Sequence, residues 1–361
     1  MKGFMTSCLF VVLSFLNTSF FSQESSKLEI SPIGTLDIFY GYDFNKPKTQ
    51  IRLPYLYNHN YHNQFAINLG TIGVQLEHKR FTSRLIFQTG SYVIQNYESE
   101  PDIFRFIHEA NIKCNLGKNK RFSIDAGILP SHIGLESAIS YDNPTYTRSI
   151  VAEQSPYYMN GLKLNYKIKD SLTISLMAFN GWQKIVKVQE NSLLSFGSQV
   201  NWQVNDKLTF NWSTFTGTTY PDSTRKMRYY SDIFGIWKWS NKSALYFGFD
   251  FGVEQKNMNS NNYNSWFAPL LILDYAIFEN TKLAARCEYY SDPNGVMIAP
   301  QGFAGAKILG SSLNLDYSFT DFLKYRLEIK MYNSKEDIFA KNTEQNTNKN
   351  IFFCSGVSLK F

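Results

Sequence analysis

Residues 322–333 read FLKYRLEIKMYN, and their regular alternation is the clearest indication of the fold class. Successive side chains of a β-strand point to opposite faces, so a strict two-residue period is the signature of a strand with two different surroundings. Here one face is apolar and the other is charged. The two sets are Leu323, Tyr325, Leu327, Ile329 and Met331 against Lys324, Arg326, Glu328 and Lys330.

The same alternation recurs along the chain from about residue 33 to the C-terminus. Residues 158–169, 243–256 and 311–319 show it clearly, each as a segment of strand length. The connections between such segments alternate as well, because a short polar turn is followed each time by a longer loop. We expect turns at 77–80, 117–120, 169–170, 205–206, 240–242, 279–281 and 320–321, and loops at 45–62, 96–101, 131–157, 184–191, 217–228, 257–263, 292–304 and 334–349.

This order of short and long connections favours a membrane barrel over a soluble β-sandwich. In hydrocarbon each unpaired backbone N–H or C=O group costs several kcal/mol, and a closed antiparallel sheet pairs them all. Strands of about 10 residues tilted near 45° cover roughly 23 Å, the height of the apolar band of outer-membrane barrels. We therefore predict an all-β transmembrane antiparallel β-barrel of about sixteen strands, with short periplasmic turns and long extracellular loops.

The composition agrees with this class of protein. The 361 residues are 43% hydrophobic and only 18% charged, and aromatic residues make up 16%. Mean hydropathy is nevertheless negative, at −0.28. A barrel reconciles the two, because half of its strand residues face lipid and the other half face a polar lumen.

The N-terminus predicts export. Met1-Lys2 is followed by the apolar run Phe4–Leu16 and then by polar residues, so residues 1–22 fit a signal peptide, with cleavage near Ser22, and residues 23–361 form the barrel as one domain. Cys8 lies early in the apolar run and does not close it, which argues against a lipoprotein cleavage site. Cleavage leaves 35 basic against 30 acidic residues, a small excess that gives no reason to expect nucleic acid as a partner.

Cysteine and histidine give no metal or disulfide pattern. The mature chain keeps Cys114, Cys287 and Cys354, an odd number far apart in sequence, which we interpret as small neutral side chains in strands. His59 and His62 lie three residues apart, but a metal site there would need further ligands nearby. We expect no metal and no cofactor.

Two places break the alternation. His108 shares its parity with apolar neighbours, so it is either a neutral residue near the membrane interface or marks a β-bulge. Ile67 and Leu69 disagree in parity with Ile72, Val74 and Leu76, which predicts a second bulge near Gly70–Gly73.

The last strand carries the features of a barrel-assembly signal. The chain ends IFFCSGVSLKF, and Phe353, Val357, Leu359 and the terminal Phe361 fall on one face. We expect these four residues to be read by the barrel-assembly machinery.

Several blocks give the chain a family resemblance. They are Asp37–Asn45 (DIFYGYDFN) followed by Pro47, Asp125–Glu136 (DAGILPSHIGLE), Ala152–Tyr158 (AEQSPYY), Asn180–Gln183 (NGWQ) and the terminal strand. With these the chain resembles the OmpL-like β-barrel porin family of Gram-negative outer membranes. The resemblance implies an outer-membrane location and pore activity, and it does not supply a substrate.

The longest internal loop, 131–157, is the candidate constriction of the lumen. It carries Glu136, Arg148 and Glu153, which we expect to shape the electric field there, unless the loop caps the outer rim instead. The candidate lumen-lining charges are Arg105, Lys113, Lys163, Lys167, Arg286, Glu288, Lys324, Arg326, Glu328 and Lys330. The basic residues among them would give a weak preference for anions.

Three functions are compatible with such a barrel. The first is a passive diffusion channel for small hydrophilic solutes, the second a surface-binding or adhesion protein that uses its long outer loops, and the third an outer-membrane barrel hydrolase. We favour the channel and expect no enzyme, since the sequence has no GxSxG, HExxH or phosphate-binding glycine motif. The expected partners are outer-membrane lipid, the assembly machinery and the solutes, and the sequence leaves monomer and trimer both open.

Overall fold

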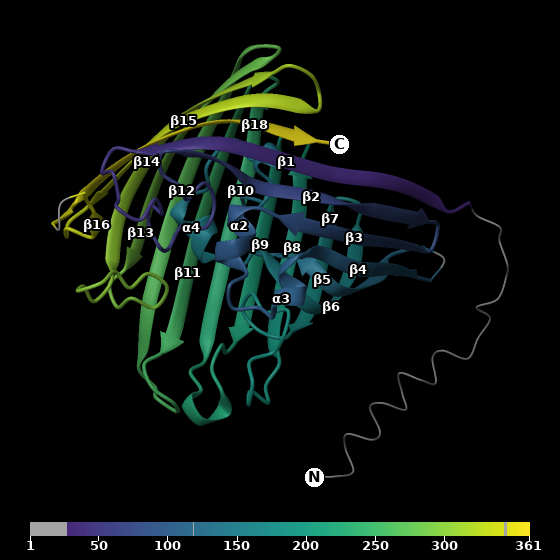
Figure 1. The fold of residues 1–361 in the computed structure, drawn as a ribbon. Helices are drawn as coiled ribbons and strands as arrows, with labels where there is room; N and C mark the ends of the chain where they lie inside the picture. Colours follow the sequence, from purple (N-terminus) through teal and green to yellow (C-terminus); the bar gives the residue numbers. More distant parts are fainter. Residues whose placement is uncertain (1–26, 118, 343–344) are drawn as a thin grey trace.

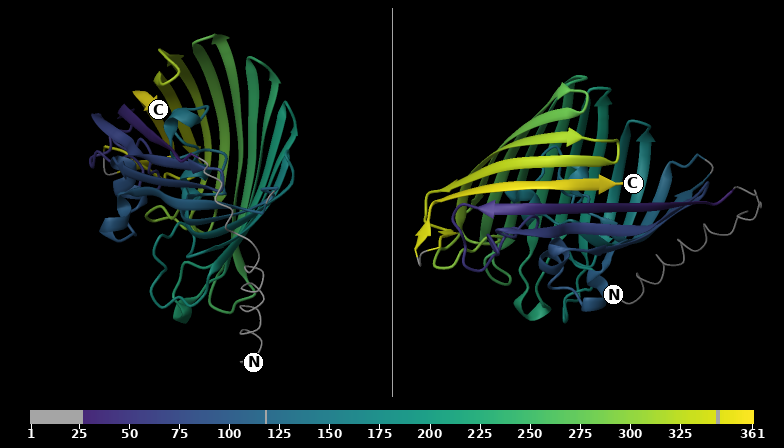
Figure 2. Two further views of the ribbon diagram at one scale, coloured as in Figure 1. Left: turned by 90° about the vertical axis from the view of Figure 1, so that its right-hand side faces the viewer. Right: turned by 45° about the horizontal axis from the view of Figure 1, so that its top comes forward.

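Sixteen strands form one closed antiparallel barrel in the computed structural model, which describes residues 27–117, 119–342 and 345–361. Each strand pairs with its neighbours in sequence, and the first and last strands close the ring (Figures 1 and 2). The barrel strands are β1 (Glu29–Asp43), β2 (Gln64–His78), β3 (Phe81–Thr89), β4 (Ile107–Leu116), β5 (Phe122–Pro130), β6 (Tyr158–Lys169), β7 (Leu172–Phe179), β8 (Ser195–Asn205), β9 (Leu208–Gly217), β10 (Arg228–Ser240), β11 (Ser243–Gln255), β12 (Tyr263–Phe278), β13 (Thr281–Asp292), β14 (Ala306–Ser318), β15 (Leu323–Ser334) and β18 (Lys349–Lys360).

The predicted fold class, strand number and order of connections are confirmed. Short turns follow the even-numbered strands from β2 to β14, and long loops follow the odd-numbered strands from β1 to β15. The loops hold the remaining elements, which are α2 (Ser91–Asn96), α3 (Asp102–Arg105), η1 (Ser140–Asp142), α4 (Ile150–Gln154), η2 (Asp222–Thr224), β16 (Phe339–Ala340) and β17 (Asn346–Thr347). The predicted signal peptide lies outside the described residues.

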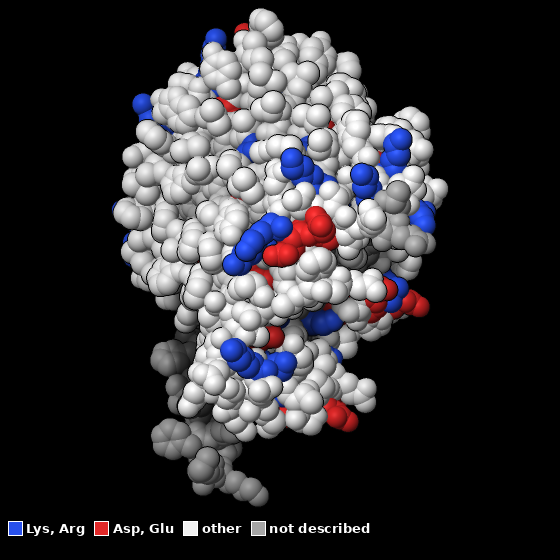
Figure 3. Space-filling view, turned by 90° about the vertical axis from the view of Figure 1, so that its left-hand side faces the viewer, with Lys and Arg blue, Asp and Glu red and all other residues white. Residues whose placement is uncertain are grey.

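The wall has its apolar side chains outside and its charges inside. On β15 the inward Arg326 is 0% exposed, whereas the outward Ile329 is 46% exposed. A Lys or Arg on the outer face near mid-membrane would cost about 2–4 kcal/mol, which explains the parity of the charges. Figure 3 shows broad uncharged areas on one face of the molecule, between a few clusters of charge. No helix in the described ranges is long and apolar enough to cross a membrane.

Six strand pairs of the described barrel contain a register shift, and two of these shifts lie in the regions where the sequence breaks its alternation. In the β3–β4 pair, Ile86 faces Glu109 and Phe87 faces Ile107, so His108 is the extra residue, and the bulge alternative is confirmed. The second bulge was predicted at the wrong place. It lies at Asn68, because Asp37 pairs with Leu69 and Ile38 with Ile67.

Asn68 is the bulged residue because its side chain turns into the barrel and is buried there. It donates to Asp37 Oδ2 at 3.1 Å and to Asn58 Oδ1 at 3.2 Å. Buried amides require such partners, and these partners lie inside the barrel.

The chain ends meet where the barrel closes. Gly34 and Phe361 exchange two backbone hydrogen bonds of 3.1 and 3.0 Å, and β1 pairs with β18 over nine residue pairs, from Thr35–Lys360 to Asp43–Phe352. Val357 and Phe361 are exposed on the outer face, as their parity predicts. The three cysteines are free and lie in strands.

Candidate lumen constriction

Loop 131–157, between β5 and β6, enters the barrel and crosses its lumen. At its start the His132 carbonyl accepts from Ser213 Oγ of β9 at 2.6 Å, and the Gly134 N–H donates to Asp232 Oδ2 of β10 at 2.9 Å. Gly134 has φ 99°, a backbone conformation that favours glycine, and this bend directs its N–H at the wall. The loop then runs to the opposite wall, formed by β13, β14, β15, β18 and β1.

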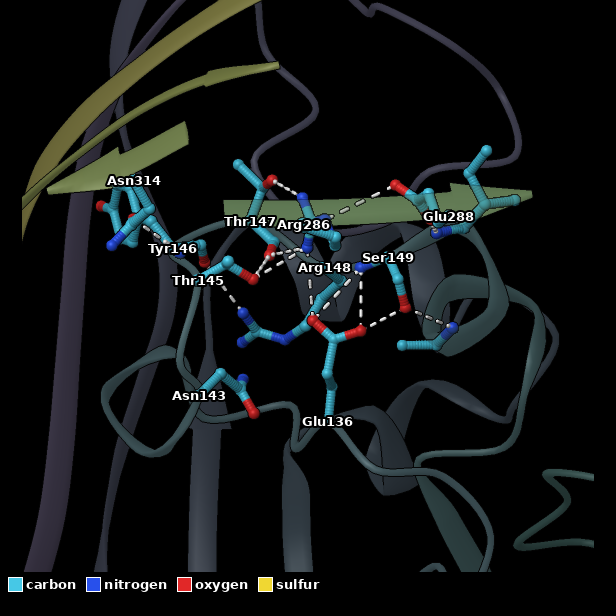
Figure 4. A network of polar contacts seen from close by, with 12 residues as sticks. Glu136, Asn143, Thr145, Tyr146, Thr147, Arg148, Ser149, Arg286, Glu288 and Asn314 are labelled. Carbon is cyan, nitrogen blue, oxygen red and sulfur yellow. Dashed lines mark hydrogen bonds and ion pairs between the residues drawn. The ribbon is translucent and has the colours of Figure 1, made fainter. Parts of the chain in front are cut away.

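One guanidinium organises the loop internally. Arg148 donates to the backbone carbonyls of Ser137, Tyr146 and Ala138 at 2.6, 2.9 and 2.8 Å. Figure 4 shows Arg148 beside Tyr146 and Glu136. Glu136 accepts from the Ser149 N–H at 3.0 Å, and Ser149 in turn caps α4 by accepting from the Ala152 N–H at 3.2 Å. The loop is therefore a folded unit whose shape depends on Glu136 and Arg148.

A charge network fixes this unit to the wall. Arg286 of β13 is 3.4 Å from Glu136 of the loop and 2.7 Å from Glu328 of β15. Lys330 is 3.4 Å from Glu288, and Arg286 is 3.6 Å from the same carboxylate. All of these side chains are buried, and buried charges are tolerated only when they are paired.

The same carboxylates also bind the loop backbone. Glu328 accepts from the Thr147 N–H at 2.6 Å and Glu288 from the Ile150 N–H at 2.5 Å. Arg286 also donates to the Thr147 carbonyl at 2.8 Å. With Arg148 included, three cations face three carboxylates (Glu136, Glu288 and Glu328), so the formal charge of this region sums to zero.

Asp37 of β1 is a second anchoring point. Its carboxylate accepts from Tyr146 Oη at 2.8 Å and from the Ser140 hydroxyl, both in loop 131–157. His59 Nε2, in the loop after β1, lies 2.9 Å from Asp37 Oδ2. One carboxylate therefore joins the first strand to two loops that are far apart in sequence.

The loop after β1, residues 44–63, also folds inward and packs on loop 131–157. Glu153 of α4 accepts from the Tyr57 N–H at 2.9 Å, and Gln154 donates to the Tyr55 carbonyl at 2.5 Å. Burial raises the pKa of the Glu153 carboxyl to about 7. At the strand end, Arg52 lies 3.2 Å from Asp43, which also accepts from Asn350.

The wall made by β4, β5 and β6 carries its charges differently. Lys113, Asp125 and Lys163 form one row of directly opposed residues across these strands. Lys113 is exposed, Asp125 and Lys163 are half-buried, and Lys163 donates to Gln199 at 2.9 Å. No residue of loop 131–157 forms an ion pair with this row among the described residues.

A cavity of about 190 Å³ remains between the loop and this side of the barrel. His108, Glu109, Tyr97, Tyr158 and the loop segment 133–139 line it. The bulge at His108 brings two consecutive side chains, His108 and Glu109, into this lining. The loop therefore fills the lumen against one wall and leaves space against the other.

The sequence-predicted residues fall into three groups. Glu136 and Arg148 lie in the buried network with Arg286, Glu288, Glu328 and Lys330, whereas Glu153 faces loop 44–63. Lys324 and Arg326 of β15 donate to the Tyr141 and Asn143 carbonyls of the loop at 3.1 and 2.9 Å. The third group, Lys113, Lys163 and Lys167, lies on the wall that the loop leaves free.

Arg105 was predicted as a lumen-lining charge of the barrel wall, but it lies outside the barrel strands. It is the last residue of α3, in the loop before β4, and its guanidinium donates to the carbonyls of Glu98 and Glu100 at 2.7 and 2.8 Å. The bulge at His108 explains the error, because residues before a bulge do not share the parity of those after it.

The sequence interpretation missed the anchoring residues Asp37, Asp43, His59 and Asn68. The first two stand in the Asp37–Asn45 block that was noticed only as a resemblance. A signal was present, since both carboxylates take the inward parity of β1, with Phe39 and Gly41 between them. The two histidines predicted as a weak metal candidate have hydrogen-bond partners, since His59 Nε2 lies 2.9 Å from Asp37 and His62 Nδ1 accepts from the Asp43 N–H at 2.9 Å. Among the described residues, no group of three metal-binding side chains occurs.

Comparisons with known proteins agree with this architecture. The family model described as "Putative beta-barrel porin-2, OmpL-like" matches residues 29–361. None of the curated proteins matches the sequence significantly.

Solved structures show the same fold at low sequence identity. An anion-selective porin from Comamonas acidovorans has a TM-score of 0.61 and 8% identity, covering 93% of this chain and 100% of its own. The trimer form of OmpT from Vibrio cholerae has a TM-score of 0.61 and 10% identity, covering 92% and 99%. The outer membrane channel DcaP of Acinetobacter baumannii has a TM-score of 0.61 and 10% identity, covering 95% and 100%.

Proposed function

Because the chain belongs to the OmpL-like beta-barrel porin-2 family, we propose that it is a passive diffusion channel for small hydrophilic solutes in the outer membrane. The observation that carries this proposal is the position of loop 131–157, which is fixed inside a polar lumen and narrows it against one wall. Porins are outer-membrane barrels with aqueous lumens, and rings of charge in a narrow section control what passes.

The charges divide the proposed path into two sides. On the side of β13–β15 the network is neutral and buried, so it positions the loop and adds little net field. On the side of β4–β6, Lys113 and Lys163 outnumber Asp125 and are accessible. We assign the weak anion preference to Lys113 and Lys163, since Arg326, Lys330 and Lys167 are compensated by Asp316, Glu288 and Asp170.

Planar-bilayer recordings with a loop deletion test the proposal. Removal of residues 137–150 takes away the segment that binds Arg286, Glu288 and Glu328, so the narrow section should widen and single-channel conductance should rise. The deletion variant must still show the heat-dependent gel mobility of a folded barrel. A folded variant with unchanged conductance would mean that the loop does not set the width, and a wild-type protein without conductance would contradict the channel itself.

The barrel-assembly machinery remains the proposed reader of Phe353, Val357, Leu359 and Phe361. The support is their outward parity on the closing strand and the exposure of the terminal phenylalanine. Replacing Phe361 by Ser should reduce the amount of folded protein in the outer membrane while leaving refolding in detergent unchanged.

A further inference from the structure

Three lysines lie on the outer surface of the barrel, at the strand ends next to the long loops. They are Lys307 of β14, Lys335 directly after β15 and Lys349 of β18, and we call them the lysine rim. All three are exposed and share the parity of outward residues such as Leu309, Met331 and Ile351. At the corresponding ends of β8, β10 and β12 the outward residues are instead Phe196, Tyr229 and Tyr263.

The lysines lie side by side and lack partners among the described residues. Ile308 pairs with Ser334, so the next residues in this register, Lys307 and Lys335, lie opposite each other on neighbouring strands. Lys349 of β18 lies opposite Asn333, which is two residues before Lys335. No described side chain forms an ion pair with any of the three ammonium groups. Like charges opposed across strands destabilise a sheet, which an anion placed between them would offset.

A cavity of about 300 Å³ opens at this rim. Lys307 and Lys335 line it together with Pro293, Phe303, Gly305 and one carboxylate, Glu336. The cavity therefore combines an apolar side with two ammonium groups. Lysine is a common ligand of phosphate groups.

Below the rim, the same strands carry an apolar groove. It measures about 340 Å³ and is lined mainly by outward residues of β13, β14, β15 and β18, and we call it the outer groove. The small side chains Ala285 and Ser311 form its low part beside Leu313, Ile329, Met331 and Ile351. These four larger residues are 37–64% exposed, so they face the membrane.

The spacing of the two features places both within one membrane leaflet. Lys307 and Ser311 are four residues apart on one strand face, about 13 Å along the strand at roughly 3.3 Å per residue and about 9 Å along the membrane normal at a tilt near 45°. The hydrocarbon of one leaflet is about 15 Å thick, half of the usual core. A molecule with an anionic head at the lysine rim would place its chain in the outer groove.

We propose that this outer wall binds one anionic lipid, with its phosphate headgroup at the lysine rim and an acyl chain in the outer groove. The site lies outside the lumen, so it does not depend on solute passage through the channel. Its charge selects a lipid with a net negative headgroup over a zwitterionic one, and its groove selects a lipid over free phosphate.

Native mass spectrometry of the purified full barrel in detergent tests the charge. The probe is diphosphoryl lipid A, with phosphatidylcholine as the zwitterionic comparison. The triple variant K307Q/K335Q/K349Q should reduce the lipid-bound fraction, corresponding to an affinity loss of roughly tenfold or more. The matched control K169Q/K207Q/K242Q removes three exposed lysines at the short-turn side and should leave binding unchanged. Equal losses in both variants, or equal binding of phosphatidylcholine, would overturn the proposal.

A second variant tests the groove without changing charge. Ala285→Phe fills the low part of the outer groove and should weaken lipid A binding while the lysine rim stays intact. Millimolar inorganic phosphate should not displace the lipid fully. If phosphate displaced it and Ala285→Phe had no effect, the rim would be a phosphate site and the lipid proposal would be wrong. Each variant is first checked for heat-dependent gel mobility, so that loss of folding is not mistaken for loss of binding.

Discussion

The two walls of the lumen use the same strand pattern for different purposes. On the docking wall, β13 to β15, inward charges such as Arg286 and Glu328 are buried and bound to loop 131–157. On the open wall, β4 to β6, the inward row of Lys113, Asp125 and Lys163 has no ion pair with that loop among the described residues. The two-residue period of a strand determines which side chains face the lumen. The contacts of loop 131–157 determine which of these side chains remain accessible to water.

The largest effect should follow from breaking the docking wall at its centre. Arg286→Met removes the cation that pairs with Glu136 and Glu328 and leaves both carboxylates buried, which typically costs about 3–5 kcal/mol. We expect a clear drop of the thermal midpoint in detergent and larger, noisier conductance. The matched change on the open wall, Lys163→Met, should stay within about 0.5 kcal/mol. Similar losses for the two variants would remove the distinction between the walls.

A smaller loss is expected at the second anchoring point. Asp37→Asn keeps the size of the side chain but weakens the bonds from Tyr146, Ser140 and His59, at a cost of about 1–3 kcal/mol. Limited proteolysis of the folded barrel should then cut loop 131–157 faster. Asp125→Asn on the open wall is the control, and its digestion pattern should match the wild type.

The pH dependence should be weaker again and should come from Glu153. Burial raises its pKa from 4.5 to about 7, so the folded protein favours the protonated acid. The stability that this group contributes is present below pH 4.5 and is lost as the pH rises through 7. In the Glu153→Gln variant, the thermal midpoint should change less with pH between pH 5 and 8. If the thermal midpoint of the variant fell with rising pH as steeply as that of the wild type, a group other than Glu153 would cause the pH dependence.

The smallest effect concerns ion selectivity. Replacing Lys113 and Lys163 by Gln should move the reversal potential under a salt gradient toward cations, because these charges are accessible. Lys330→Gln should disturb the loop instead, since Lys330 is buried beside Glu288. Clear cation preference in the wild-type channel would refute the anion preference altogether.

The fold was predictable because lipid imposes a simple rule. Every strand needs an apolar residue at alternate positions, so the inward and outward faces of β15 and β6 can be recognised in the sequence. The alternation of short and long connections gives the strand number. The bulge at Asn68 was misplaced and Arg105 was misassigned, because bulges and short helices depend on hydrogen bonds that are distant in sequence.

The constriction was only partly predictable. The length of loop 131–157 and its charges pointed to the lumen, and Glu136 and Arg148 do lie in the buried network. Which wall holds the loop could not be read from the sequence, since Lys163 and Lys330 have the same inward parity. The difference arises from partners such as Thr147 and Glu328, 181 residues apart.

The position of Asp37 and Glu328 has a consequence for biogenesis. Loop 131–157 lies in the first half of the chain, but it binds β1 through Asp37 and β15 through Glu328, and Asp142 pairs with Lys360 of the last strand. The wall surface that binds the loop is therefore incomplete until the final hairpin has been synthesised and joined to the first strand. Narrowing of the passage is thus coupled to closure of the seam, because the contacts that hold the loop join residues far apart in sequence and need β1, β15 and β18 in place.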